Sequence, residues 1–301
     1  VYLYMNEPRN MPAAFFQHRP EMAGARSRPT YDLVSMCTSD ARVRRWLADA
    51  LAFVFTEVPD LGGVFTITAS ENPTHCASHG RQADCPRCRQ RTPAEIIAEI
   101  NATIAEGVHR ANPAAKVIAW DWGWARHGEA SDYVRLLPKD VWFMSVSEWA
   151  QPFERGGVKG KVGEYSISVV GPGPRATRHW AVARERGLKT VAKVQLNNTW
   201  ELSSLPFLPV MDLVAEHCSR LADAGIDGLM LSWSLGGYPS PNLRLAQGLL
   251  DRRHPDAATA LAALAAERYG PAAAPDARRA WTAFSRGFQE FPYGLGLYTA
   301  P

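Results

Sequence analysis

Short runs of apolar and β-branched residues recur along this chain, and most of them end in a carboxylate, an amide or a tryptophan. Runs such as VFTI and LMLSW are apolar throughout, which is typical of parallel strands buried on both faces. The predicted strands cover residues 1–7, 63–71, 116–124, 141–149, 165–170, 189–200 and 228–233. Most of the stretches between them have helical periodicity, so we expect a parallel sheet with right-handed crossovers.

Helix signals fit the gaps between these strands. Residues 92–95 (TPAE) form a capping box with proline at the first helical position. Ser39 or Asp40 caps an earlier helix, and later helices are predicted over residues 174–186 and 210–221. The alternation of strand and helix therefore runs through most of the chain.

This alternation predicts an α/β fold of the (β/α)8 TIM-barrel type, in which functional side chains lie where the strands end. Seven strands are visible of the eight that a closed barrel needs, so we expect the first strand to precede Val1. Residues 1–250 would then form an N-terminally truncated barrel. Two helical stretches, 257–269 and 276–290, predict a helical extension over residues 251–301 that packs on the barrel.

Composition excludes some classes of protein. The chain has 301 residues, of which 46% are hydrophobic and 21% are charged, and its formal net charge is +3. No basic run or basic helix face stands out, so we expect no nucleic-acid partner. No apolar run is long enough to cross a membrane. The sequence leaves the oligomeric state open.

Three acids at predicted strand ends have the chemistry of a glycosidase. Glu71 follows an apolar strand, and a half-buried carboxyl there can have the raised pKa that a general acid needs. Asp121 and Glu148 end the next two strands, and either could be the nucleophile or the base that activates water. The sequence thus predicts hydrolysis of a glycosidic bond by a carboxylate pair at the C-terminal rim of the barrel.

Other residues at the strand ends are suited to binding a carbohydrate substrate. Indoles stack on sugar rings and polar groups orient the hydroxyls, although a lone tryptophan is more often part of the core. The expected substrate-binding residues are Glu7, Arg9, Asn72, Trp122, Trp124, Trp149, Asn197, Asn198, Trp200, Glu201 and Trp233. Two alternatives stay open, namely a carbohydrate-binding barrel without turnover and a lyase or isomerase that uses a metal bound by Glu7, Asp121 and Glu148.

Two cysteine motifs follow Glu71 closely. Cys76 and His79 form a C-x-x-H pair, and Cys85 and Cys88 form a C-x-x-C pair. Three thiolates and one imidazole would complete a tetrahedral structural zinc site. His75 is the competing fourth ligand.

The alternative to zinc is one disulfide in a secreted enzyme. A zinc site would instead favour a cytoplasmic protein, because thiols stay reduced in that compartment. The two remaining cysteines, Cys37 and Cys218, stand apart in the sequence and are expected to be buried thiols.

Residues 63–72 (GVFTITASEN) resemble the glycoside hydrolases that share a barrel with the α-glucuronidases and the β-N-acetylhexosaminidases. In α-glucuronidases such a strand ends in Ser-Glu, and Ser70 and Glu71 match that pair. Barrel proteins of this kind also carry a C-x-x-C soon after the acid, and their helical tail resembles residues 288–293 (FQEFPY). The resemblance implies a glycosidase with Glu71 as its general acid. The paired Asp-Glu of the hexosaminidases is absent.

Overall fold

The computed structural model describes residues 1–6, 8–26, 32–69, 73–233, 236–251, 253 and 255–294, apart from the side chain of His127. The chain divides into two compact units. Unit 1 holds residues 1–145 and 179–190, and unit 2 holds residues 146–178 and 191–301. The division into a barrel and an extension at residue 250 stays a prediction.

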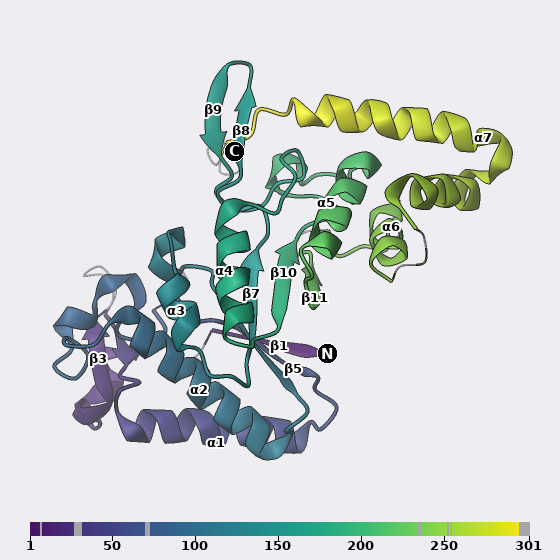
Figure 1. Ribbon diagram of the computed structural model, residues 1–301. Coiled ribbons are helices and arrows are strands. Elements are labelled where there is room, and N and C mark those ends of the chain that lie inside the picture. Colours follow the sequence, from purple (N-terminus) through teal and green to yellow (C-terminus); the bar gives the residue numbers. More distant parts are fainter. Residues whose placement is uncertain are drawn as a thin grey trace. The chain divides into compact units, whose positions relative to one another are not determined.

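Six strands form a parallel sheet in the order β1-β5-β6-β7-β10-β11 (Figure 1). They are β1 (Tyr2–Met5), β5 (Gly63–Ile67), β6 (Lys116–Trp120), β7 (Trp142–Val146), β10 (Thr190–Val194) and β11 (Gly228–Leu231). In the β5–β6 pair, Val64 lies opposite Val117 and Ile67 lies opposite Trp120. The mixed α/β architecture and the parallel sheet are therefore confirmed, with strands shorter than predicted.

One predicted strand, over residues 165–170, is wrong. Its backbone does not join the sheet, because the side chain of Glu201 takes up its donors. Oε2 of Glu201 accepts a hydrogen bond from the amide of Ile167 at 2.7 Å, and Oε1 accepts one from the hydroxyl of Ser166 at 2.8 Å. The alternating pattern YSISVV thus marks a buried loop.

The expected barrel is corrected as well. Within the described residues the sheet has six strands, with β1 and β11 at its edges, so this part of the chain does not form a full eight-stranded barrel. The two adjacent strands β10 and β11 differ in burial, since all five residues of β10 are buried and none of the four residues of β11 is. Strand β11 therefore lacks the cover that an inner barrel strand has.

The described residues of unit 1 form three α-helices and part of a fourth. They are α1 (Ala41–Glu57), α2 (Pro93–Ala111), α3 (Ser131–Leu136) and α4 (Pro174–Glu185), which begins in unit 2. The side chain of Asp40 caps α1, and the predicted capping box of Thr92 and Glu95 is present at the start of α2. Both helix starts were predicted correctly because each depends on residues close in sequence.

Helices α1 and α2 lie side by side (Figure 1). Gly107 of α2 faces the backbone of α1, and a Cβ atom placed there would lie 2.5 Å from the carbonyl oxygen of Ala48. A residue without a side chain is therefore needed at this crossing.

A small antiparallel sheet in unit 1 was not predicted. Its order is β2-β4-β3, and its strands are β2 (Met11–Pro12), β3 (Ala23–Arg26) and β4 (Leu33–Met36). Val34 and Met36 of β4 pack with Phe16 and with Val43 of α1. This packing holds the end of β4, and the cysteine that follows it, against the larger part of the unit.

Unit 2 contains a hairpin and the remaining helices. They are β8 (Pro152–Arg155), β9 (Val158–Lys161), α5 (Met211–Asp223), α6 (Pro241–Leu250) and α7 (Ala257–Gln289). Helix α7 kinks at Gly270, where φ is 80°, between the two helical stretches predicted from the sequence. Phe288 near its end packs on buried Ile167 and Leu213.

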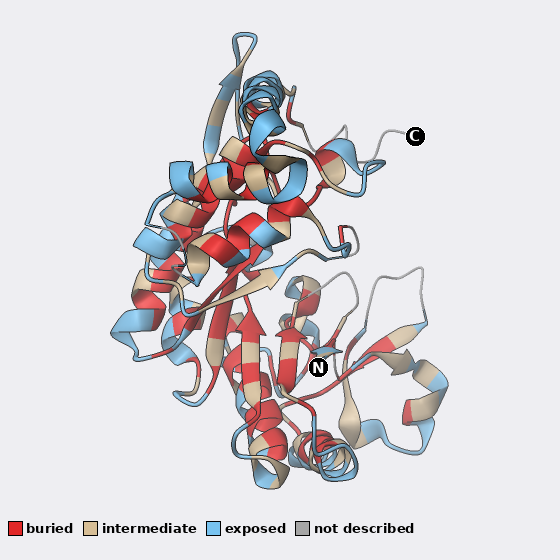
Figure 2. Ribbon diagram, turned by 90° about the vertical axis from the view of Figure 1, so that its right-hand side faces the viewer, coloured by how far each residue is buried: buried red, intermediate tan, exposed pale blue. Residues whose placement is uncertain are grey.

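Short 3-10 turns link these elements. They are η1 (Ala13–Gln17), η2 (Pro20–Met22), η3 (Ser78–Gly80), η4 (Gln82–Asp84), η5 (Trp124–His127) and η6 (Trp200–Leu202). Figure 2 shows buried residues along the strands and exposed ones on the outer turns of the helices. Among the described helices, none combines the length and the apolar character needed to cross a membrane.

We predict that Gly107→Ala destabilises the protein by about 1–3 kcal/mol, the usual cost of overpacking a tight contact. Gly287→Ala in α7 is the matched control, because a Cβ there meets no neighbouring atom within 4 Å. It should be neutral or slightly stabilising through its higher helix propensity. Urea unfolding followed by circular dichroism compares the two. An unchanged midpoint for Gly107→Ala would show that the helices can move apart freely.

Candidate functional site

Four buried cysteines of unit 1 converge on one point. They are Cys37, Cys76, Cys85 and Cys88, and their sulfur atoms all lie within 4.8 Å of one another. Sγ of Cys37 is 3.6 Å from Sγ of Cys85 and 3.7 Å from Sγ of Cys88. None of these four cysteines forms a disulfide. Four sulfurs at 2.3 Å from a tetrahedral zinc would lie about 3.8 Å apart. The spacing therefore fits a metal centre.

The fourth member of this group corrects the sequence interpretation. Cys37 was expected to be an isolated thiol, but it follows β4 directly and lies within 4.8 Å of the other three sulfur atoms, whereas His79 does not belong to this group. His75, the competing ligand, is held elsewhere, since its Nδ1 accepts a hydrogen bond from the amide of Ala77 and its Nε2 contacts the carbonyl of Thr68. Sequence spacing could not reveal Cys37, because the fold alone brings it near.

The four thiol groups strongly affect one another's ionisation. A hydrogen bond with Cys76 is the largest of the effects that together lower the pKa of Cys37 to about 6. The pKa of Cys76 is raised in turn, first by its contact with Cys37 and next by its contact with Cys85. Four negative charges cannot share so small a volume, whereas a divalent cation would allow all four thiols to ionise.

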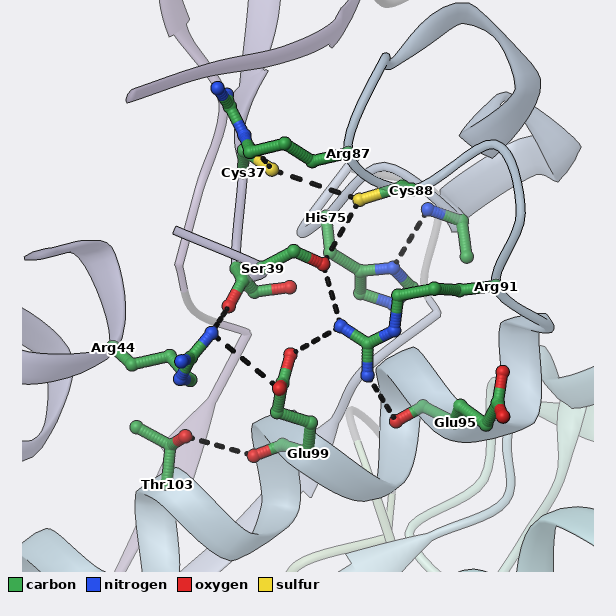
Figure 3. A network of polar contacts seen from close by, with 12 residues as sticks. Cys37, Ser39, Arg44, His75, Arg87, Cys88, Arg91, Glu95, Glu99 and Thr103 are labelled. Atoms are coloured by element: carbon green, nitrogen blue, oxygen red, sulfur yellow. Dashed lines mark hydrogen bonds and ion pairs between the residues drawn. The ribbon is translucent and has the colours of Figure 1, made fainter. Parts of the chain in front are cut away.

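Polar side chains around the cysteines fix them in place (Figure 3). Arg87 donates to Sγ of Cys37 at 3.1 Å, and the hydroxyl of Ser39 lies 3.2 Å from Sγ of Cys88. Arg91 donates to Oγ of Ser39 at 2.6 Å. Such outer contacts orient metal ligands and balance their charge. By contrast, Cys218 is a buried thiol as predicted, and burial raises its pKa to about 12.

Unit 2 holds a second cluster, around Glu148. This residue follows β7 and is completely buried, and neither carboxyl oxygen has a hydrogen-bond partner among the described residues. Burial raises the pKa of Glu148 well above its ordinary value, and the positive charge of Lys193 offsets only part of this rise. The carboxyl therefore retains its proton under conditions in which an exposed glutamate has lost it.

Lys193, in β10, is the positive group of this cluster. Its side chain is completely buried, and Nζ lies 4.7 Å from the ring centre of Tyr165. Burial lowers the pKa of Lys193 to about 7, and Glu148 and Glu164 partly oppose this shift. A buried acid with a raised pKa beside a buried amine with a lowered pKa is an arrangement typical of functional sites.

The imidazole of His217 completes the surroundings of Glu148. Its Nδ1 lies 3.5 Å from Oε1 of Glu148, and its Nε2 lies 2.8 Å from Oγ of Ser147. Burial lowers the pKa of His217 to about 3, and nearby Arg220 lowers it further. The ring is therefore neutral and does not supply the charge that would stabilise an ionised Glu148.

Asp121 lies in unit 1, directly after β6. Its Oδ2 accepts a hydrogen bond from Oγ of Ser145 at 2.8 Å and lies 2.8 Å from Nδ1 of His179. Nε2 of the same imidazole lies 3.0 Å from Oε1 of Glu129, whose side chain is half exposed. Nε2 also accepts a hydrogen bond from the amide of Ala130 at 3.0 Å, so the ring is held on both sides. Sequence analysis did not single out either His179 or Glu129.

The predicted tryptophans have different surroundings. Trp124 is buried and donates to Oγ1 of Thr68 at 2.9 Å, and Trp149 is buried beneath the guanidinium of Arg175. Both contribute to packing. The remaining three have solvent-accessible surface that could stack on a sugar, and they are Trp122, Trp200 and Trp233.

The other predicted binding residues also include side chains that are buried and side chains that are exposed. Asn197 and Asn198 are buried, and their side-chain amides donate to backbone carbonyls, including that of Tyr238 at 2.8 Å. Glu201 is held by residues 166–168. These three side chains therefore stabilise loops. Arg9 is exposed, whereas the remaining predicted site residues, Glu7, Glu71 and Asn72, lie outside the described residues.

No family model matches the chain, and no curated protein matches it in sequence. Solved structures of glycoside hydrolases are similar to it. The glycoside hydrolase domain of PelA from Pseudomonas aeruginosa is 15% identical over 78% of each chain, with a TM-score of 0.41. A family 89 enzyme from Clostridium perfringens is 15% identical over 84% of this chain and 24% of its own, with a TM-score of 0.44. An exo-β-N-acetylglucosaminidase from Vibrio harveyi is 11% identical over 93% and 43%, with a TM-score of 0.41. This likeness assigns neither a substrate nor a catalytic residue.

We predict that Lys193 makes stability rise with pH above about 7. Its pKa in the folded protein is about 7, against an ordinary value of 10.5. Between these values the unfolded chain binds the additional proton, so the free energy of unfolding increases as pH rises through this window. Urea unfolding at pH 7 and pH 10 should show a smaller increase for Lys193→Met than for the parent. Exposed Lys139→Met is the control and should behave as the parent does. The same pH dependence in all three proteins would contradict the burial effect.

Proposed function

We propose that this chain hydrolyses a glycosidic bond, with carboxyl groups at the ends of its parallel strands. The observation that carries the proposal is Glu148, a fully buried carboxyl after β7 whose pKa is raised well above its ordinary value. Glycosidases need such a carboxyl to protonate the oxygen of the leaving group. Glu148 therefore fits the role of proton donor better than the role of base or nucleophile considered from the sequence.

Hydrolysis requires a second carboxyl group. Asp121, which follows β6, is one candidate from the sequence. Glu71 follows β5 in the sequence and is the other candidate; its predicted role as the general acid is a competing proposal. Exposed surface on Trp122, Trp200 and Trp233 would support stacking of the sugar.

Glu148→Gln should lower turnover of aryl glycosides with poor leaving groups by about 100-fold or more, since the proton donor is lost. Turnover of dinitrophenyl glycosides, whose leaving group needs no proton, should fall much less. The measurement is kcat/KM across a series of aryl glycosides of increasing leaving-group acidity. Glu154→Gln, on the exposed hairpin, is the matched control and should follow the parent.

The same series distinguishes the alternatives. If Glu71→Gln shows the leaving-group dependence and Glu148→Gln does not, Glu71 is the acid and Glu148 is not the proton donor. If no glycoside or polysaccharide is hydrolysed while sugars still bind, the alternative of a carbohydrate-binding protein without catalytic turnover is favoured.

We further propose that the cysteine centre holds a structural zinc ion, ligated by Cys37, Cys76, Cys85 and Cys88. Support comes from the sulfur spacing, the burial of all four thiols and the donors around them. Four protein ligands leave no open coordination position, so the ion would stabilise the fold and take no part in the reaction. Reduced thiols of this kind support the expectation that the protein is cytoplasmic.

Metal analysis of the purified protein should find about one zinc per chain, as a closed four-ligand site requires. Cys37→Ser and Cys85→Ser should each lose the metal and reduce protection of residues 73–91 from proteolysis. His79→Ala and Cys218→Ser are matched controls and should retain it. Loss of zinc in His79→Ala, with retention in Cys37→Ser, would restore the ligand set expected from the sequence.

A further inference from the structure

A small cavity of about 160 Å³ lies in unit 1, beside the loop that carries three of the cysteines. Its walls come from β3, β4, this loop and η5. The polar side chains that line it are those of Arg26, Ser35, Ser78, His79, Arg81 and Arg126. Pockets for drug-sized ligands usually measure about 300–1,000 Å³. This cavity therefore has room for one small group and not for an oligosaccharide.

The cavity carries an excess of positive charge. Nη1 of Arg26 lies 3.4 Å from Asp32 with both side chains mostly exposed, and Nε of Arg81 donates to Asp84 at 2.6 Å. Arg126 has no acidic partner among the described residues. Nη2 of Arg81 also lies 2.5 Å from the same oxygen of Asp84, whereas the Arg26 pair is mostly exposed and therefore weak. Three guanidinium groups thus line the cavity region against two carboxylates.

The backbone is bent to bring these side chains to the cavity. His79 and Arg126 both have left-handed conformations, with φ of 59° and 45°, and Ala125 before Arg126 also has φ of 45°. Such conformations are uncommon for residues other than glycine. Unfavourable backbone conformations persist where the surrounding structure enforces them, which is frequent at ligand sites.

The cysteine centre holds two walls of the cavity together. The amide of Ala25, next to Arg26, donates to Sγ of Cys76 at 3.4 Å. Ser78, only two residues after Cys76, accepts a hydrogen bond from the amide of Thr74 at 3.0 Å. The backbone of β3 and the hydroxyl of Ser78 are therefore held in place before any ligand arrives, which reduces the entropic cost of binding.

We propose that this cavity binds an oxyanion, namely a carboxylate, sulfate or phosphate group. Guanidinium groups bind such groups through paired, charge-assisted hydrogen bonds. Because the proposed function acts on a sugar, we assign the anion to a substituent of an acidic sugar. This last assignment rests on the proposed hydrolysis, whereas binding of the anion does not.

Isothermal titration calorimetry on the zinc-loaded full chain, in Tris buffer of low salt, tests the site. Sulfate, phosphate, glucuronic acid and glucose 6-sulfate are titrated separately, with glucose as the neutral control. At least one anion should bind, and Arg126→Gln should weaken that binding by about tenfold or more, the usual effect of losing a charged hydrogen bond. Arg135→Gln is the matched control, because Arg135 is exposed on α3 and pairs with Asp132.

Comparison of the separate titrations identifies the source of the anion. Tighter binding of the charged sugars than of sulfate or phosphate identifies a glycan substituent, whereas the reverse identifies a free inorganic anion and overturns the sugar assignment. Equal affinity of the parent and Arg126→Gln for every anion, or no binding by the parent, overturns the site itself. Glu148→Gln should bind anions as the parent does. Arg126-dependent binding without any hydrolysis would therefore leave the cavity proposal intact and remove the proposed function alone.

Discussion

Convergence of four buried sulfurs is the constraint on which much of unit 1 depends. Residues 73–92, which precede α2, contain little regular structure, and such a loop would ordinarily be mobile. Three of its cysteines meet Cys37, which follows β4. This contact links the small antiparallel sheet with the loop, and through Arg91 it reaches Glu99 of α2. Contacts among the sulfur atoms thus stabilise this loop, as apolar packing stabilises the helices.

The two units solve the burial of polar groups in different ways. In unit 1, Asp121 is satisfied by Ser145 and by an imidazole that reaches an exposed carboxylate. In unit 2, Glu148 and Lys193 are buried without hydrogen bonds among the described residues, and each shifts its pKa toward the neutral form. The carboxylate of Asp121 is thus held by polar partners, whereas burial favours the neutral forms of Glu148 and Lys193.

Features that depend on neighbouring residues in the sequence were predicted correctly, whereas features that depend on contacts between distant residues were not. The capping box at Thr92 fixed the start of α2 correctly because all its atoms come from one turn of chain. Gly270 marked the break in the last helix for the same reason. Cys37 was missed as a ligand because its partners are distant in sequence. Residues 165–170 have strand-like alternation, and only the position of Glu201 shows that their amides are already occupied.

The role of Glu201 has a consequence for the order of folding. Its carboxylate accepts hydrogen bonds from a segment about 35 residues earlier in the chain, and these replace the ladder that a strand would have formed. Contacts across such a separation form only after the entropic cost of closing the intervening loop has been met. During synthesis, residues 165–170 leave the ribosome before the group that will hold them. These residues therefore reach their final conformation only after β10 and the turn that carries Glu201 have been made.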